Sequence, residues 1–330
     1  MKAILEHLFQ HKTLSKDEAK EILTDIASGR HNHSQIASFL TAFIMRNISL
    51  EELRGFREGL LGLCHKIDVS SYKAMDVCGT GGDGKNTFNI STLTAFVLAG
   101  TGIPVVKHGN YGVSSVSGSS NVLEHLGVRF QTDERLIAAQ ISEAGICFLH
   151  APLFHPAMRH VAPVRKDLGV KTFFNMLGPL VNPAQPKVQM VGVFSMELAR
   201  MYQYLFQEED VHYTIIHALD GFDEITLTAD CKIITTNGER IVNASHFGFD
   251  KVAYEDLHGG DTVQEAADIF MKIISGNGTA SQNNVVLANA AMAIQTYYPS
   301  LQLATAINLA KHSLFELKAK ESFNILKAIQ

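Results

Sequence analysis

The first 65 residues carry hydrophobic positions at helical spacing. Between residues 34 and 47, apolar side chains form one wide helical stripe, at Ile36, Phe39, Leu40, Phe43 and Ile44. The S-x-x-E capping boxes at 15–18 and 49–52 mark the starts of two further helices. The pattern therefore predicts a set of short helices. Apolar faces this broad fit a partner subunit as well as an intramolecular core, and the pattern leaves both open.

From residue 74 onward the pattern changes to short apolar runs separated by helical segments. The runs are typical of strands and cover residues 74–79, 103–109, 146–151, 188–195, 213–219, 224–229 and 231–236. This alternation predicts an α/β fold with a mostly parallel central sheet. Residues 155–169 are expected to form a helix, and residues 175–186 a loop punctuated by Gly and Pro. The chain ends on an amphipathic helical stretch over residues 303–329.

Length and composition narrow the class of protein. The 330 residues are 46% hydrophobic and 18% charged, which predicts a folded chain with one large and one smaller domain. The net charge of −5 argues against a protein whose main ligand is nucleic acid. The sequence has no run of about 18 apolar residues and no signal-peptide core, so no membrane partner is expected. The four cysteines, none in a C-x-x-C pair, are typical of a cytoplasmic protein.

A glycine-rich loop occupies the stretch "DVCGTGGDGKNTFNIST" at residues 76–92. It lies between a predicted strand and a helix that is expected to start near Ser91 or Thr92. Ligands of open α/β sheets bind at this end of the strands. Glycine amides and a helix N-terminus together favour an anion, so the loop predicts a phosphate site.

The same loop matches two nucleotide-binding motifs only in part. A dinucleotide site needs an acidic residue about 20 residues further on. No Asp or Glu occurs from residue 85 to 123, and Lys107 stands where the acid is needed. A P-loop needs Ser or Thr directly after its lysine. Here Asn86 follows Lys85, and Asp83 would place a carboxylate among the phosphates. A different phosphate ligand is therefore expected.

A second phosphate-friendly loop follows the next predicted strand. It contains Lys107, His108 and Asn110, with glycines at 109, 112 and 118 and serines at 114, 115, 117, 119 and 120. No acidic residue occurs in it before Glu124. A run of Ser and Gly is often a plain surface turn. Its place directly after a strand, matching that of the first loop, favours a second anion-binding segment instead.

Taken together, the motifs resemble the anthranilate phosphoribosyltransferases, a family of tryptophan biosynthesis. The similar segments occur in the family's order, at residues 79–92, 107–128, 155–183, 221–227 and 282–294. The resemblance implies transfer of the phosphoribosyl group of phosphoribosyl pyrophosphate (PRPP) to the amine of anthranilate. The products would be N-(5-phosphoribosyl)anthranilate and pyrophosphate.

The resemblance also implies the architecture. It is that of the nucleoside-phosphorylase-like transferases, with a small discontinuous all-helical domain and a larger α/β domain. The helical domain would cover residues 1–66 and be completed by about 162–185, and the α/β domain would cover 67–161 and 186–330. A homodimer through the helical domain is expected, with PRPP and anthranilate as small-molecule partners and no nucleic acid or membrane.

Site residues follow from the family motifs. PRPP is expected to contact Gly79, Gly82, Asp83, Thr87, Asn89, Ile90, Ser91, Thr92, Lys107, His108, Gly109, Asn110, Tyr111, Gly112, Val113, Ser114, Ser115 and Ser119. Anthranilate is expected to contact Gly79, Asn110, Arg165 and Gly178, with the planar guanidinium binding its carboxylate. The resemblance implies Mg²⁺, two ions per active site, held by Ser91, Asp223 and Glu224.

No residue is assigned a catalytic role. His155 and His108 could act as bases, but an aromatic amine that attacks an oxocarbenium-like carbon needs little base assistance. Arg159 lies close to Arg165 in sequence and is expected to have a packing role. The chain departs from many family members at Tyr111-Gly112, where they carry Arg and a small residue.

Two alternatives stay open at this point. A nucleoside phosphorylase on the same fold would need a base-binding site and would leave Arg165 and the 221–224 motif without a reason. A catalytically silent relative that binds nucleic acid conflicts with the acidic balance and with the retained Asp223-Glu224 pair.

Overall fold

The computed structural model describes residues 1–112 and 117–330. They form two compact units, one of residues 1–67 with 151–183 and one of residues 68–150 with 184–330. Of the predicted donor-binding residues, Val113, Ser114 and Ser115 lie outside the described part of the chain.

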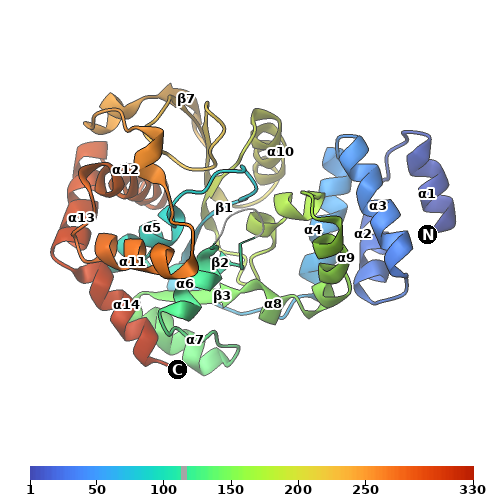
Figure 1. The fold of residues 1–330 in the computed structure, drawn as a ribbon, viewed down its shortest axis with the longest axis horizontal. Helices are drawn as coiled ribbons and strands as arrows, with labels where there is room; N and C mark the ends of the chain where they lie inside the picture. Colours follow the sequence, from blue (N-terminus) through green and yellow to red (C-terminus); the bar gives the residue numbers. More distant parts are fainter. Residues whose placement is uncertain (113–116) are drawn as a thin grey trace. The chain divides into compact units, whose positions relative to one another are not determined.

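The first unit is helical (Figure 1). Its first segment forms α1 (Lys2–Phe9), α2 (Lys16–Ala27), α3 (His33–Met45) and α4 (Leu50–Leu63). The capping boxes predicted at Ser15 and Ser49 are both confirmed, because each hydroxyl accepts a bond from the amide three residues on and the Glu there reaches back. A further box at Asn32 begins α3. Local sequence signals therefore fix where these helices begin.

The second segment of this unit returns as short helical pieces. They are α8 (Ala151–Phe154), η3 (Pro156–His160), α9 (Ala162–Leu168), η4 (Phe173–Met176) and η5 (Gly178–Val181). The single helix expected over 155–169 is broken in two, with Pro163 in the first turn of α9. The return was expected from about residue 162, but it begins at Ala151 because η3 packs against α2 and α4. The loop expected over 175–186 contains η5 and the end of η4.

An aromatic cluster joins the two segments of the helical unit. Phe56 of α4 stacks on Phe173 of η4 with ring centroids 4.4 Å apart. Phe39 and Phe43 of α3 meet Phe173 edge to face, at 6.1 and 5.2 Å. The stripe predicted on α3 therefore contributes to an intramolecular core, and edge-to-face pairs add to its packing.

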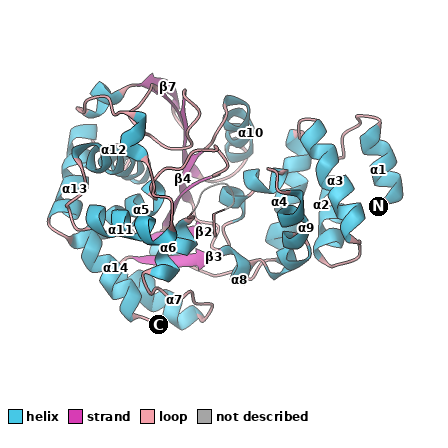
Figure 2. Cartoon of the chain, viewed as in Figure 1, coloured by secondary structure: helices cyan, strands magenta, loops and turns pink. Residues whose placement is uncertain are grey.

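The second unit is built on a seven-stranded sheet (Figure 2). Its strands are β1 (Met75–Gly79), β2 (Val105–Gly109), β3 (Ile146–His150), β4 (Val188–Gly192), β5 (His212–Ala218), β6 (Cys231–Thr235) and β7 (Gly238–Val242). The order is β3-β2-β1-β4-β5-β6-β7, parallel from β3 through β5 and antiparallel for the last two pairs. The predicted mostly parallel α/β sheet is confirmed.

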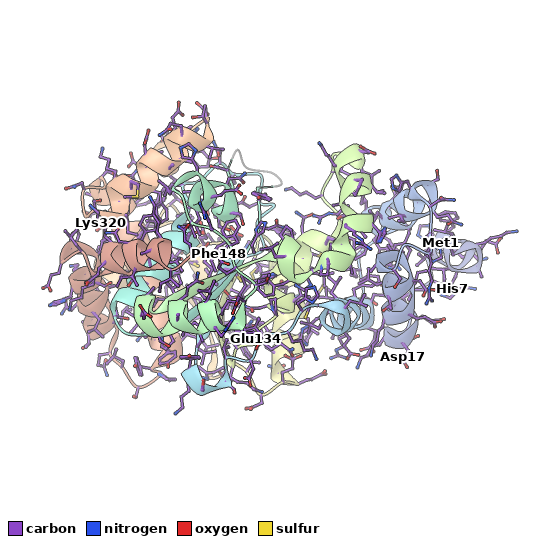
Figure 3. The ribbon with its side chains drawn as sticks, turned by 90° about the horizontal axis from the view of Figure 1, so that it is seen from below. Met1, His7, Asp17, Glu134, Phe148 and Lys320 are labelled. Carbon is purple, nitrogen blue, oxygen red and sulfur yellow. The ribbon has the colours of Figure 1, made fainter. Side chains whose placement is uncertain are left out.

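Helices cover this sheet. They are η1 (Ser70–Tyr72), α5 (Ile90–Gly100), α6 (Ser119–His125), α7 (Glu134–Ala139), η2 (Gln140–Ala144), α10 (Met196–Gln207), η6 (Ala244–Phe247), η7 (Tyr254–Leu257), α11 (Val263–Ile274), α12 (Ala280–Tyr297), α13 (Leu303–Phe315) and α14 (Lys318–Ala328). Helices α5 and α12 pack on the sheet and on each other, and α14 packs on α5. Phe148 of β3 lies inside the unit and Glu134 at its surface (Figure 3).

The run at 224–229 is not a strand, and this prediction was wrong. Its backbone is bound by a side chain in place of a neighbouring strand, because Asn289 of α12 accepts from the amide of Ile225 and donates to its carbonyl. Leu227 has a φ of +61°, which breaks an extended run. The segment is apolar because it is buried. Likewise the long helix expected at the C-terminus is split, with Leu317 at a φ of +64° between α13 and α14.

Candidate active site

The strand order creates a topological switch point at the carboxyl end of the parallel strands. From β1 the chain runs outward through β2 to β3 and then returns to β4 on the other side of β1. Open α/β sheets bind ligands where the strand order reverses in this way. The last residues of the two central strands, Gly79 and Gly192, are paired with each other. The glycine-rich loop predicted to bind the donor, called the donor loop below, begins directly after Gly79.

Asp223 packs directly over this point. A Cβ atom added to Gly79 would lie 2.2 Å from Asp223 Oδ2, and one added to Gly192 would lie 1.4 Å from the Asp223 carbonyl oxygen. Both strands must therefore end in glycine for the 221–224 segment to approach so closely. Gly192 was not among the predicted residues. In the sequence it lies inside the strand predicted over 188–195, where nothing marks it as the last strand residue.

The donor loop is bound to Asp223 and exposes glycine backbone. Oδ2 of Asp223 accepts a bond from the Gly81 amide at 2.7 Å. Gly81, Gly82 and Gly84 all have φ between +61° and +76°, a region open to glycine but costly for other residues. Asp83 accepts a bond from the Lys85 amide at 2.9 Å, which turns its carboxylate back onto its own loop.

The start of α5 brings the second carboxylate into the same site. Glu224 Oε1 accepts a bond from the Ser91 amide at 2.9 Å, in the first turn of the helix. The predicted donor contacts Ile90 and Thr92 have almost fully buried side chains, 0% and 1% exposed. These values cover the whole residue, so neither the side chain nor the backbone of either is exposed in this structure. The Ile90 amide donates to the Phe88 carbonyl at 2.6 Å, so the amides of Ile90 and Ser91 are both engaged within the chain.

Lys107 is buried beneath this arrangement. Its side chain, on β2, is 2% exposed, and Nζ donates to the Val77 carbonyl at 2.6 Å and to Ser91 Oγ at 3.3 Å. Burial lowers the pKa of this ammonium. The predicted point charge therefore lies between β1 and the first turn of α5.

The paired carboxylates are strained electrostatically. Burial raises the pKa of Asp223 to about 6, with the charge of Asp83 adding to the effect. Burial and the neighbouring Asp223 raise the pKa of Glu224. Two carboxylates in a site with little solvent favour a cation between or beside them.

The donor set fits Mg²⁺. Among the described residues, no group of three or more His, Cys, Asp and Glu side chains is placed to hold a metal ion. The site offers two adjacent carboxylates, which accept bonds from the Gly81 and Ser91 amides, with the Ser91 hydroxyl nearby. Mg²⁺ is commonly bound by one or two carboxylates together with substrate phosphates. The predicted ligand set thus agrees with the chemistry of the ion.

The second predicted loop follows β2 and turns back on itself. Asn110 Oδ1 accepts from the Tyr111 amide at 2.8 Å, and Asn121 Oδ1 accepts from the Gly112 and Gly118 amides at 2.9 and 3.0 Å. The amides of Tyr111 and Gly112 are therefore already engaged within the chain. Ser119 Oγ donates to the Asn110 carbonyl at 3.3 Å.

Tyr111, the departure from the family pattern, is held by two side chains of the α/β unit. Its hydroxyl donates to Glu124 at 3.3 Å, and its ring meets that of His150 edge to face at 4.8 Å. His150 in turn bonds Ser120 Oγ at 2.8 Å. His108 and Gly109 lie at the end of β2, where the His108 amide donates to Asp76 at 3.3 Å.

The predicted acceptor residues Arg165 and Gly178 belong to the helical unit. Arg165 is half-buried in α9, where it donates to Asn175 Oδ1 at 3.4 Å and lies over the Phe174 ring at 5.2 Å. Within residues 1–112 and 117–330, no acidic side chain pairs with it. Gly178 faces open space, since an added Cβ would meet no atom within 4 Å. Arg159 is exposed and donates to His160.

The surroundings of His155 favour a structural role over that of a base. Its side chain is 5% exposed and Nε2 bonds the Val181 carbonyl at 2.9 Å. Burial lowers its pKa to about 4. Both observations favour a role in holding η5 in place.

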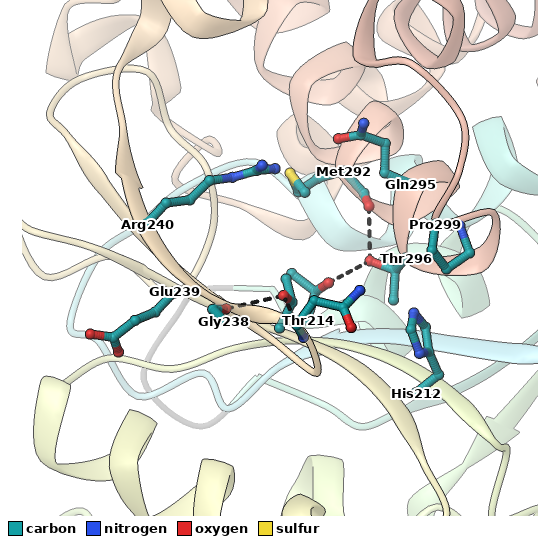
Figure 4. Close-up of a pocket in the computed structure, with 11 residues that line it drawn as sticks. His212, Thr214, Gly238, Glu239, Arg240, Met292, Gln295, Thr296 and Pro299 are labelled. Atoms are coloured by element: carbon teal, nitrogen blue, oxygen red, sulfur yellow. Dashed lines mark hydrogen bonds between the residues drawn. The ribbon is translucent and has the colours of Figure 1, made fainter.

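A cavity of about 310 Å³ occurs elsewhere in the α/β unit (Figure 4). It lies between α12 and the start of β5, where Thr296 and Thr214 hydroxyls are 2.7 Å apart. Its described lining contains none of the predicted site residues. Because it opens at the amino end of β5, it is separate from the strand ends that carry the site.

Similarity to known proteins agrees with the geometry. Residues 71–319 match the family model of the "Glycosyl transferase family, a/b domain". Residues 2–64 match that of the "Glycosyl transferase family, helical bundle domain". The chain therefore belongs to the glycosyl transferase family that combines a helical bundle with an α/β domain. In the part of the chain that the structure describes, no helix is long and apolar enough to cross a membrane.

Individual relatives narrow the class further. The chain is 57% identical over 329 residues to the anthranilate phosphoribosyltransferase of Flavobacterium psychrophilum, covering 100% of this chain and 99% of the relative. The enzyme of Flavobacterium johnsoniae is 56% identical, covering 100% and 98%. Within its family, the chain thus belongs to the anthranilate phosphoribosyltransferases of tryptophan biosynthesis.

Solved structures give the same result. The Thermus thermophilus enzyme aligns with a TM-score of 0.89 at 31% identity, covering 98% of each chain. A Saccharomyces cerevisiae enzyme in complex with PRPP and Mg aligns with a TM-score of 0.90 at 26% identity, covering 98% of this chain and 96% of that one. These matches favour the transferase over the phosphorylase and nucleic-acid-binding alternatives.

Proposed function

We propose that this chain transfers the phosphoribosyl group of PRPP to the amine of anthranilate, and that PRPP binds where β1 and β4 end. The observation that carries the proposal is the buried pair Asp223 and Glu224, each bound to a backbone amide of a predicted phosphate loop. One carboxylate thereby faces the glycine loop and the other the first turn of α5. A polyanionic donor that brings Mg²⁺ with it matches this arrangement of charge.

The chain's own residues would bind and orient the donor. Backbone amides of residues 82–84 in the glycine loop suit phosphate oxygens. Lys107 provides a fixed positive charge below Ser91. Mg²⁺, when bound, would neutralise the departing pyrophosphate.

The acceptor would be bound through its carboxylate. Arg165 has no acidic partner among the described residues, and Asn175 orients its guanidinium. A planar guanidinium suits a carboxylate through two parallel bonds. We propose that Asn110, Gly79 and Gly178 border the aromatic ring of anthranilate. The amine then attacks C1 of the ribose as the bond to pyrophosphate breaks, and the new C–N bond is followed by loss of an amine proton.

Calorimetric titration of PRPP tests the donor site. Wild-type protein should bind PRPP more tightly with Mg²⁺ than without it. Asp223→Asn should lose most of this difference, because it removes a ligand charge at nearly constant volume. Asp220→Asn is the matched control, since that carboxylate bonds Thr228 instead. Equal Mg²⁺ dependence in Asp223→Asn would overturn the assignment of the metal site.

We further propose that the helical unit forms the interface of a homodimer. A cavity of about 430 Å³ lies between α1 and α3, lined by Leu8, Ala37, Thr41 and Met45 among others. Large apolar side chains stand exposed on the same two helices, with Phe9 61%, Ile44 44% and Met45 76% exposed. A contiguous apolar surface of this kind is typical of an interaction site, and a second copy of this chain is the expected occupant.

A cytoplasmic location is also proposed. Cys64, Cys78, Cys147 and Cys231 are all free thiols, and cytoplasmic proteins keep their cysteines reduced.

A further inference from the structure

Lys85 forms an aromatic stack that the family motif does not account for. Its Nζ lies 4.8 Å from the centroid of Phe222 and 5.2 Å from that of Tyr254. The two rings are 5.6 Å apart and tilted. No acidic side chain of the described residues pairs with this ammonium. The cation is therefore held by ring faces, an interaction that strengthens as water is excluded.

Each member of the stack comes from a different part of the site. Lys85 belongs to the donor loop, Phe222 directly precedes Asp223, and Tyr254 begins η7. Phe222 is 1% exposed and Tyr254 is 52% exposed. The stack therefore joins the phosphate loop to the segment that carries both carboxylates.

The segment that carries Tyr254 is bound along the donor loop. The Phe88 amide donates to the Leu257 carbonyl at 3.0 Å, and the Gly259 amide donates to the Asn86 carbonyl at 2.8 Å. Asn86 Nδ2 donates to the Gly260 carbonyl at 2.8 Å. Tyr254 is thus one end of a segment already fixed to the loop by three bonds.

The metal-binding segment has little room to adjust. Glycines at the ends of β1 and β4 allow Asp223 its close approach, and a single Cβ on either would collide with it. A shift of Phe222 must pass to Asp223, the next residue. Two contacts set the distance between Asp223 and the donor loop. One is the bond from the Gly81 amide to Asp223, and the other is the contact of Lys85 with Phe222.

We propose that Lys85 is a positioning residue for the metal ligands. Through its contacts with Phe222 and Tyr254 it holds Asp223 and Glu224 where they can share Mg²⁺ with the phosphates of the donor. The inference rests on the proposed metal site and adds to it two residues, Lys85 and Tyr254, that are not metal ligands. The Lys85 ammonium acts through the two rings and does not contact the donor.

The first test compares four variants by calorimetry and kinetics. Lys85→Met keeps the length of the side chain and removes its charge, and Tyr254→Leu removes one ring. Both should weaken Mg²⁺-dependent PRPP binding about threefold to tenfold, the range that a lost cation–π contact represents. KM for anthranilate should stay unchanged, and the melting temperature should fall only slightly, because one such contact contributes little to the stability of the whole fold. Lys85→Arg and Tyr254→Phe keep a cation and a ring at these positions and should behave like wild type.

A double-mutant cycle separates positioning from direct charge. If Lys85 acts through the stack, Lys85→Met combined with Tyr254→Leu should cost little more than either change alone. Lys311→Met is the matched control, because that ammonium lies 5.7 Å from the Phe249 ring and away from the loop.

Three results would overturn the inference. They are unchanged Mg²⁺ dependence in Lys85→Met, additive effects in the double variant, and PRPP binding by Lys85→Met that is weakened equally with and without Mg²⁺. If instead Asp223→Asn itself kept full Mg²⁺ dependence, the proposed metal site would fail, and the two failures are thereby distinguishable.

Discussion

At the scale of single residues, the guanidinium of Arg165 has the clearest expected effect. Arg165→Lys keeps the charge and removes the planar fork, so KM for anthranilate should rise by about tenfold or more, the size of a lost charge-assisted bond. KM for PRPP should change little. Steady-state kinetics with both substrates varied measures the two constants. Arg159→Lys serves as the control, and an unchanged anthranilate KM in Arg165→Lys would remove this residue from the acceptor site.

The buried His155 is expected to make the stability of the fold depend on pH in the acid range. Burial lowers its pKa from 6.5 to about 4, so the unfolded chain binds the proton more readily than the folded one. The stability contributed by the neutral ring is present above pH 6.5 and is lost as pH falls toward 4. His155→Gln can still donate to Val181 and does not titrate. Its melting temperature should fall less steeply between pH 6.5 and 4 than that of wild type, and equal slopes would contradict the assignment.

Single residues also show what the sequence could and could not indicate. Asp223 and Glu224 were predicted because they lie in the Gly-x-Asp-Glu motif of the family that the chain resembles. Gly192 and Asn121 were missed because their roles depend on what lies opposite them in space: the Asp223 carbonyl in one case, the Gly112 and Gly118 amides in the other. A glycine or an asparagine carries no sign of its distant partner.

At the scale of elements, the 254–260 segment is expected to hold the donor loop in shape. A Cβ at Gly259 would lie 2.4 Å from the Thr87 carbonyl oxygen, a backbone atom that cannot swing aside. Gly259→Ala should therefore raise KM for PRPP several-fold by displacing residues 86–88. Gly62→Ala is the control. An added Cβ there meets nothing within 4 Å, so the change should stabilise α4 by about 0.5–1 kcal/mol. Unchanged PRPP kinetics in Gly259→Ala would show that the loop does not depend on this segment.

Elements with a local signal were predicted well, and the others were not. Capping boxes marked α2 and α4, and apolar runs between turns located six of the seven strands. The run at 224–229 has the composition of a strand but bonds to Asn289 instead. Strand β7 was missed because four of its five residues are exposed, which leaves no apolar run to detect.

At the scale of the whole molecule, the helical unit is expected to control assembly. Met45→Glu places a charge on its exposed apolar surface, so the dimer should dissociate to monomer or become concentration-dependent. Size-exclusion chromatography with light scattering measures the mass. Tyr204→Glu, on α10 and 53% exposed in wild type, is the control and should remain dimeric. A wild-type protein that is monomeric at micromolar concentration would contradict the proposal.

The position of the proposed donor site could be predicted from the sequence, whereas the burial of its side chains could not. A glycine loop after a strand and before a helix indicates an anion site in an α/β fold, and the strand order places that loop at the point where the sheet reverses. The burial of Lys107 and the bonds of both carboxylates to loop amides depend on tertiary packing. They required the structure.

The most direct test of the account is the loss of anthranilate fluorescence on adding PRPP and Mg²⁺, with wild type beside Glu224→Gln. The account predicts that anthranilate is consumed only when both are present. It also predicts that Glu224→Gln lowers kcat/KM for PRPP by about a hundredfold, the upper end of what losing a residue that only orients a metal ligand costs. Consumption without Mg²⁺, or a Glu224→Gln variant as active as wild type, would contradict a reaction centred on these two carboxylates.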